Sequence, residues 1–176
     1  MTRELIATPS PENWIWRISV AEVASAGAFS DFAGVQRWLA ILKGSGVRLS
    51  MPTALVELTP STDPLAFDGA TPIHCSLLKG PVQDLNLMLR GDDNTASMQR
   101  VGGTQCLSLV AAKIVAIYSA DSPVYLRCAN SACVIPKETL AWQLLPAGIE
   151  LMLETNHAVL MQIATVAATP VTLVSF

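Results

Sequence analysis

Short segments in which polar and apolar residues alternate recur along the chain about every ten residues, and glycine, proline and other turn-forming residues separate them. Alternation with a period of two is typical of β-strands that have one buried face. Many short strands at near-regular spacing predict an all-β sandwich or barrel. We therefore expect helix to be a minor component.

Turn signals bound the segments that we expect to be strands. A proline-rich turn over 8–13 precedes the first of them, and Gly44 and Gly46 predict a hairpin between their neighbours. The run 105–119 mixes valine, isoleucine and alanine, lacks helix caps and is expected to form two strands or one long bent strand. The other expected strands are 14–21, 35–43, 47–51, 53–58, 73–78, 80–90, 124–128, 132–135, 139–144, 149–154, 157–166 and 171–176.

The chain of 176 residues is long enough for one domain or for two small, closely joined ones. Hydrophobic residues make up 51% of it and charged residues 14%, which predicts a large interior or an apolar surface given to another subunit, so we expect oligomerisation. A net charge of −3 without basic clusters favours neither nucleic acid nor a membrane surface as partner. The first residues lack a signal-peptide pattern, so a cytoplasmic location is expected.

The segment 80–90, GPVQDLNLMLR, opens as a turn and then alternates strictly. Asp84, Asn86 and Met88 share one face of the expected strand, and three leucines share the other. A carboxylate and a carboxamide then lie about 7 Å apart on a rigid element. They either face water or line a cavity, and periodicity alone leaves both interpretations open.

Two arginines lie in similarly apolar strands. Arg17 shares a face with Ser19, either as a solvated residue of an edge strand or as part of a polar site. Arg37 begins an apolar face, where it either pairs with an acidic neighbour or offers a planar, permanently charged group to a ligand carboxylate. Between them, the glycine-rich loop 24–34 is expected to form the rim of a pocket.

Three segments together carry a family resemblance: NWIWRISVAEV, GAFSDFAGVQRWLAILKGSGVRL and PLAFDGATPIHCSLLKGPVQDLNLMLR. Their elements W-x-W-R-x-S, G-x-F-S-x-F-x-G-x-x-R and G-P-x-x-D-x-N-x-M-x-R resemble those of the HutD/Ves family of small cytoplasmic cupin-like proteins, some of which are encoded with bacterial histidine-utilisation genes. The likeness runs in order from Asn13 to Arg90, about half of the chain.

The resemblance implies a cupin-like (RmlC-like) double barrel, in which one chain forms two β-barrels (a bicupin), and a protein that forms a homodimer. Residues 1–176 would form one compact unit with its midpoint near 91–96. It also implies a protein that binds a small carboxylate, such as urocanate or N-formylglutamate, and regulates histidine utilisation without catalysing a step. By position in the motifs, and with Met88 completing an apolar wall, the expected ligand-binding residues are Arg17, Ser19, Phe29, Ser30, Arg37, Asp84, Asn86 and Met88.

Few residues of this sequence suit metal or covalent chemistry. His74 and His157 stand far apart and no H-x-H occurs, so we expect no metal or other cofactor. The four cysteines are interpreted as buried thiols. Nucleophile-elbow and phosphate-loop motifs are absent, and no catalytic residue is assigned. Two alternatives stay open: a cupin-type isomerase or hydrolase acting on a small acid, with Asp84 as its acid-base group, and a dimeric interaction module without a ligand.

Overall fold

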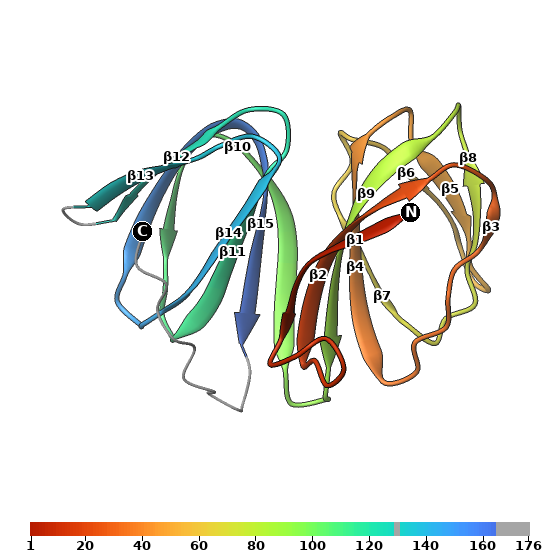
Figure 1. Cartoon of the computed structure of the whole chain (residues 1–176), viewed down its shortest axis with the longest axis horizontal. Helices are drawn as coiled ribbons and strands as arrows, with labels where there is room; N and C mark the ends of the chain where they lie inside the picture. Colours follow the sequence, from red (N-terminus) through yellow and green to blue (C-terminus); the bar gives the residue numbers. More distant parts are fainter. Residues whose placement is uncertain (129–130, 165–176) are drawn as a thin grey trace. The chain divides into compact units, whose positions relative to one another are not determined.

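The computed structural model describes residues 1–128 and 131–164, which contain strands and no helix (Figure 1). The expected all-β class is therefore confirmed. The chain divides into two compact units, Met1–Asp92 and Asp93–Phe176, which we call unit 1 and unit 2. The expectation that the whole chain forms one compact unit stays a prediction. Among the described residues, no helix is long and apolar enough to cross a membrane.

Unit 1 consists of two sheets. The five-stranded sheet has the order β1-β2-β9-β4-β7, and the four-stranded sheet has the order β3-β8-β5-β6. The strands are β1 (Thr2–Thr8), β2 (Trp16–Val23), β3 (Gly27–Ala28), β4 (Val35–Lys43), β5 (Val47–Ser50), β6 (Leu55–Leu58), β7 (Leu65–Asp68), β8 (His74–Leu77) and β9 (Val82–Arg90).

Strand β9 lies in the middle of the five-stranded sheet, with antiparallel neighbours β2 and β4. Leu85, Leu87 and Leu89 are buried on one of its faces, as the alternation predicts. The apolar core of unit 1 joins its two sheets. It contains Leu39 and Ile41 of β4 together with Val47, Leu49, Leu58, Phe67, Ile73, Cys75 and Val82.

The turn between β4 and β5 is not a hairpin, which corrects the prediction from Gly44 and Gly46. Strand β4 pairs with β7 and β9, whereas β5 pairs with β6 and β8, so the turn carries the chain from one sheet to the other. Both glycines have positive φ angles, and a Cβ atom at Gly46 would lie 2.3 Å from the Leu58 carbonyl oxygen. Two glycines therefore mark a tight change of sheet as readily as a hairpin.

The sequence does not predict strand β1, because the proline-rich turn that follows it resembles an entry into the fold. It pairs with β2 in antiparallel register, from Thr2 opposite Ala21 to Thr8 opposite Trp16. Strand β2 consequently lies inside the sheet, and the interpretation of Arg17 as a residue of an edge strand was wrong.

Unit 2 is a six-stranded sheet with the order β13-β12-β15-β11-β14, in which β10 also pairs with β15. Its strands are β10 (Thr95–Ser108), β11 (Lys113–Ser119), β12 (Val124–Cys128), β13 (Ser131–Ile135), β14 (Thr139–Leu145) and β15 (Glu150–Ala164). The run 105–119 thus contains the end of one strand and the whole of the next. The expected strand 171–176 lies outside the described residues.

Strand β15 is one continuous strand, although two strands were expected. Strand β10 pairs along nearly all of it on one side, while β12 and β11 pair with its first and second halves on the other. A register shift between Val101 and Gly103 absorbs the irregularity near Asn156. The core of unit 2 is aliphatic: Val101, Leu109, Val115, Ile117, Val124, Ile135, Leu151, Leu153, Ala158 and Leu160.

The cysteines correct a further expectation. Cys75 is buried, but Cys106 and Cys133 are exposed and Cys128 is half-buried; all four are free thiols. Cys106 and Cys133 lie in strands of the exposed part of the unit 2 sheet, where alternation turns small apolar residues outward as well as inward.

Candidate functional site

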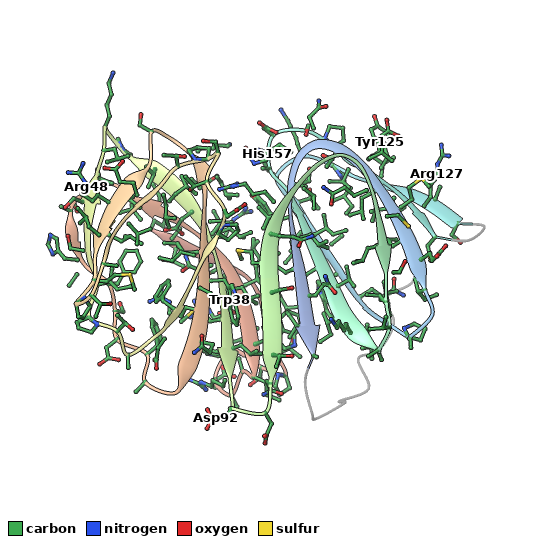
Figure 2. All side chains as sticks on the ribbon, turned by 180° about the vertical axis from the view of Figure 1, so that it is seen from behind. Trp38, Arg48, Asp92, Tyr125, Arg127 and His157 are labelled. Carbon is green, nitrogen blue, oxygen red and sulfur yellow. The ribbon has the colours of Figure 1, made fainter. Side chains whose placement is uncertain are left out.

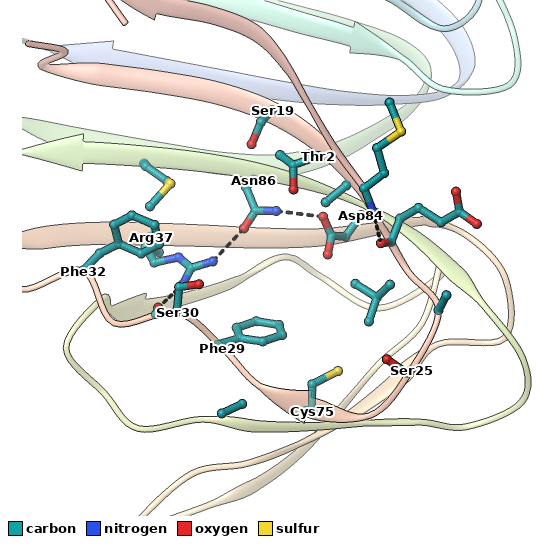
Figure 3. A pocket seen from close by; sticks show the side chains of 18 of the residues that line it. Thr2, Ser19, Ser25, Phe29, Ser30, Phe32, Arg37, Cys75, Asp84 and Asn86 are labelled. Carbon is teal, nitrogen blue, oxygen red and sulfur yellow. Dashed lines mark hydrogen bonds between the residues drawn. The ribbon is translucent and has the colours of Figure 1, made fainter. Parts of the chain in front are cut away.

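Unit 1 contains a cavity of about 550 Å³ that is open to solvent (Figure 3). Strands β1, β2, β4, β8 and β9 and the segment 23–32 line it. All eight residues that the sequence indicates for ligand binding lie on its wall: Arg17, Ser19, Phe29, Ser30, Arg37, Asp84, Asn86 and Met88. The structure thus brings together eight side chains, of which the first and the last, Arg17 and Met88, are 71 positions apart in the sequence.

Strand pairing explains why these side chains meet. Opposite residues of neighbouring antiparallel strands point to the same side of a sheet. Arg17, Met88 and Arg37 form one such row across β2, β9 and β4. The next rows along are Ser19, Asn86 and Leu39, and then Ala21, Asp84 and Ile41. The polar side chains therefore share one face because each strand alternates in the same register.

Arg37 is the cation at the inner wall of the cavity. Its side chain is 7% exposed, and its guanidinium carbon lies 5.0 to 5.4 Å from the ring centres of Phe29, Phe32 and Phe67. Nη2 donates a hydrogen bond to Asn86 Oδ1 (3.1 Å) and Nη1 donates one to the Ser30 carbonyl oxygen (3.3 Å).

The guanidinium of Arg37 is not fully satisfied. Its buried Nε–H has no hydrogen-bond partner among the described residues. Burial lowers the pKa of Arg37, and the nearby charge of Asp84 acts in the opposite direction. Arginine nevertheless stays protonated in proteins, so the cavity wall holds a permanent positive charge with donor capacity to spare.

Asp84 is the acidic group of the same wall and is 3% exposed. Asn86 connects it to Arg37, because Asn86 Nδ2 donates to Asp84 Oδ1 at 2.7 Å while Asn86 Oδ1 accepts from Arg37 (Figure 3). Burial raises the pKa of Asp84 to about 7, against the opposing effects of the Ala21 backbone N–H, Arg37, Asn86 and the α-amino group of Met1. Asp84 therefore titrates near neutral pH.

Arg17 has a different environment from Arg37. Its Nε lies 2.9 Å from Glu4 Oε2 of β1, the strand that pairs with β2, in an ion pair that lacks hydrogen-bond geometry. Its charge is accordingly neutralised at the edge of the cavity, and Arg37 is the better placed of the two to bind an anion.

Sequence reasoning missed several residues of the wall. Phe67 stacks on Arg37 because it is opposite Arg37 in the β4–β7 pairing, a contact that no local pattern reveals. Thr2 lines the cavity from the unpredicted strand β1. Cys75 also lines it; burial, followed by the charge of Asp84, raises the pKa of this thiol to about 11, so the thiol stays neutral.

The two histidines lie in different units and outside this cavity. His74 is exposed and lines a second cavity of unit 1, of about 460 Å³. In unit 2, His157 Nε2 accepts from Arg100 Nη1 at 3.1 Å, and its Nδ1 lies 3.7 Å from Asp121 Oδ1. No group of three or more potential metal-ligating His, Cys, Asp or Glu side chains occurs among residues 1–128 and 131–164.

Taken together, the fold and the site define an all-β, cupin-like protein with a polar, arginine-containing cavity. Its fold is similar to that of a cupin 2 conserved barrel domain protein from Leptotrichia buccalis, with a TM-score of 0.56 and 10% identity over 94% of this chain and 88% of that one. The HutD family matches residues 1–166, and the chain belongs to this family.

Individual relatives agree with this assignment. The chain is 36% identical over 120 residues to an uncharacterised 21.2 kDa protein in the hutC 3′ region of Pseudomonas putida, which covers 65% of this chain and 60% of that protein. It is 34% identical over 93 residues to protein Ves of Citrobacter koseri, covering 52% and 49%. The matches thus span about half to three-fifths of these relatives.

Two solved structures resemble the chain over most of its length, each at 25% identity. A conserved protein of unknown function from Pseudomonas aeruginosa PAO1 has a TM-score of 0.80, with 92% of this chain and 87% of that one covered. HutD from Pseudomonas fluorescens SBW25, solved in a formate condition, has a TM-score of 0.78, with 93% and 87% covered.

Proposed function

We propose that the chain is a metal-independent binding protein for a small carboxylate, such as urocanate or N-formylglutamate, and that it regulates histidine utilisation. The observation that carries this proposal is the state of Arg37: a buried guanidinium on the cavity wall with an unpartnered Nε–H. Arginine donors and carboxylates form strong charge-assisted hydrogen bonds. A ligand carboxylate in the cavity would pair with this guanidinium, whose unpartnered Nε–H is itself shielded from solvent.

The surroundings of Arg37 suit such a ligand. The rings of Phe29 and Phe32 pack against the guanidinium and offer apolar surface to the rest of a small acid. Asn86 is fixed by its two hydrogen bonds and keeps one further amide N–H for a ligand oxygen. Preorganised groups of this kind lower the entropic cost of binding.

The regulatory part of the proposal draws on relatives. The Pseudomonas putida relative lies in the hutC 3′ region, and one related HutD structure was obtained in a formate condition, formate being the smallest carboxylate. We place the function in unit 1 and propose that unit 2 is the second cupin-like barrel of a bicupin. We propose that the protein acts in the cytoplasm and forms a homodimer.

The test is ligand-induced thermal stabilisation. Urocanate, N-formylglutamate and formate are added to the wild-type protein, to Arg37→Ala and to the control Arg48→Ala. Arg48 lies in β5 on the surface, where it pairs with Glu57 (Figure 2). We expect Arg37→Ala to abolish the rise in Tm and Arg48→Ala to keep it. Arg37→Lys retains the charge but not the planar donor pair, so it should weaken binding by about tenfold or more.

Two results would contradict the proposal. If the carboxylates raise the Tm of Arg37→Ala as much as that of the wild type, they do not bind at Arg37 in this cavity. A wild-type protein that binds none of the three carboxylates, measured by calorimetry up to millimolar concentrations, would remove the proposed ligand class.

A second candidate follows from Asp84. A carboxyl group with a pKa of about 7 in a cavity has the acid strength that proton transfer near neutral pH requires. A cupin-type isomerase or hydrolase would consume a small acid and lose turnover in Asp84→Asn while still binding it. Product analysis after incubation with urocanate or N-formylglutamate distinguishes this candidate from a binding protein, which returns the ligand unchanged.

A further inference from the structure

The groups that face Asp84 come from every strand around it. Arg37 approaches from β4 through Asn86, and Cys75 approaches from β8 as a neutral thiol. From β2 comes the Ala21 backbone N–H, and beside β1 lies the α-amino group of Met1, which donates to the Glu22 carbonyl oxygen at 3.1 Å. Arg17, the remaining cation of the wall, is already paired with Glu4.

The charges of the inner wall are balanced before any ligand arrives. Arg37 contributes one positive charge and ionised Asp84 one negative charge, and Asn86 connects the two by hydrogen bonds of 3.1 and 2.7 Å. An incoming carboxylate at Arg37 adds a second negative charge in the same buried space. An uncompensated charge in a buried site is costly, and two neighbouring carboxylates raise each other's affinity for a proton.

We propose that this cavity takes up an organic acid together with one proton, which Asp84 carries. The inference rests on the proposed function and specifies how that site works. Asp84 is the group suited to receive the proton, because it is 3% exposed and its burial already opposes its ionised form. Cys75 holds its own proton throughout the neutral range, and Arg37 does not release one.

Protonation also changes what Asp84 offers to the ligand. An ionised carboxylate accepts hydrogen bonds only, whereas a protonated one gains an O–H donor. The site therefore favours an acid that carries a neutral acceptor, such as an amide or acyl carbonyl oxygen, close to its carboxylate. A ligand with a cationic group would instead pair with ionised Asp84 and bring no proton.

Calorimetry in two buffers with different ionisation enthalpies measures the number of protons taken up per bound ligand. N-formylglutamate and formate are suitable probes because their own carboxyl groups are ionised throughout the range used. At about pH 8 we expect between about 0.5 and one proton per ligand, and about none at pH 5.5. Affinity should fall above about pH 7, by at most about tenfold per pH unit.

Asp84→Asn supplies the decisive comparison, because its amide mimics the protonated acid in size and charge. We expect it to bind without proton uptake and with an affinity that does not vary with pH. Cys75→Ser, a change on the same wall, should keep the wild-type proton count.

The outcomes separate the two proposals. Binding without proton uptake in the wild type overturns the proton linkage and leaves carboxylate binding intact. Uptake that persists in Asp84→Asn overturns it as well, because another group, such as the Met1 amine, then carries the proton. A wild type that binds neither probe overturns the proposed function and this inference together.

Discussion

Units 1 and 2 are both built of antiparallel strands around a central strand, yet they treat buried polar groups differently. Among the residues that the structure describes, the buried polar or charged side chains of unit 1 are Ser19, Arg37, Asp84 and Asn86, all on one cavity wall. Those of unit 2 are Ser119 and Thr155, and each donates to a backbone carbonyl oxygen of the loop at 122–123. The second pair fixes a loop, whereas the first group faces space.

The central strands show the difference directly. The face of β15 that packs into the core of unit 2 carries Leu151, Leu153 and Leu160. The cavity face of β9 carries Asp84 and Asn86 instead. Buried ionisable groups cost stability unless they are fully paired, and aliphatic side chains would pack the same space more stably. Unit 1 is therefore expected to be less stably packed at this wall, which is where we propose that a polar ligand binds.

The largest expected effect is on the filled interior. Leu160→Ala in β15 should lower the free energy of unfolding by about 2 to 5 kcal/mol, because a tightly packed core collapses little around a new hole. Leu144→Ala, at a partly exposed position of β14 in the same unit, should cost less than about 1 kcal/mol. Urea denaturation measures both. If both variants lose equally little free energy of unfolding, the interior of unit 2 is not tightly packed and the contrast with unit 1 fails.

In the hollow unit, removing the buried charge should increase stability. The pKa of Asp84 is raised from 3.8 to about 7, so the folded state binds more protons than the unfolded state between these values. The stability contributed by this group is therefore present below about pH 4 and is lost as the pH rises to about 7. Asp84→Asn should raise the free energy of unfolding by about 2 to 4 kcal/mol at pH 8 and leave it nearly unchanged at pH 4.

Denaturation of both proteins at the two pH values tests this sign. A loss of stability in Asp84→Asn at pH 8 would show that the ionised carboxylate is favourably paired with Arg37. The units would then differ in having or lacking this cavity, and not in the cost of a buried charge.

The smallest effect concerns the two kinds of buried hydroxyl. Thr155→Val removes the hydrogen bond of 3.1 Å to the Pro123 carbonyl oxygen and should cost about 1 kcal/mol. Ser19→Ala, on the cavity wall, should change stability by less than about 0.5 kcal/mol, because a hydroxyl beside an open cavity can be solvated. Chemical denaturation with both variants checks the difference. The reverse order would assign a structural role to Ser19.

Local patterns sufficed for the parts of the site that depend on one strand. Alternation in 80–90 placed Asp84, Asn86 and Met88 on one face. Alternation in two other strands indicated Arg17 and Arg37, and the resemblance to the HutD/Ves family added Phe29 and Ser30 as ligand-binding residues. Periodicity could not decide between water and a cavity, since that depends on whether a second sheet covers the face. In the structure, β8 and the segment before β4 provide this cover.

Features that depend on long-range pairing were beyond the sequence. The contact of Phe67 with Arg37 requires the pairing of β7 with β4. The ion pair of Arg17 with Glu4 requires the pairing of β1 with β2. The turn at Gly44 and Gly46 was misassigned because a hairpin and a change of sheet need the same backbone freedom. Continuity of β15 likewise depends on partners on both sides rather than on its own residues.

The most direct measurement is the side-chain N–H signal of Arg37 in a ¹H–¹⁵N NMR titration, assigned through its loss in Arg37→Lys. This Nε–H is buried and has no hydrogen-bond partner among the described residues. If a small carboxylate binds there, saturation with formate or N-formylglutamate should move the proton signal downfield, as expected for a new charge-assisted hydrogen bond. Binding that saturates while the Arg37 signal stays in place would contradict the assignment of this cavity as the carboxylate site.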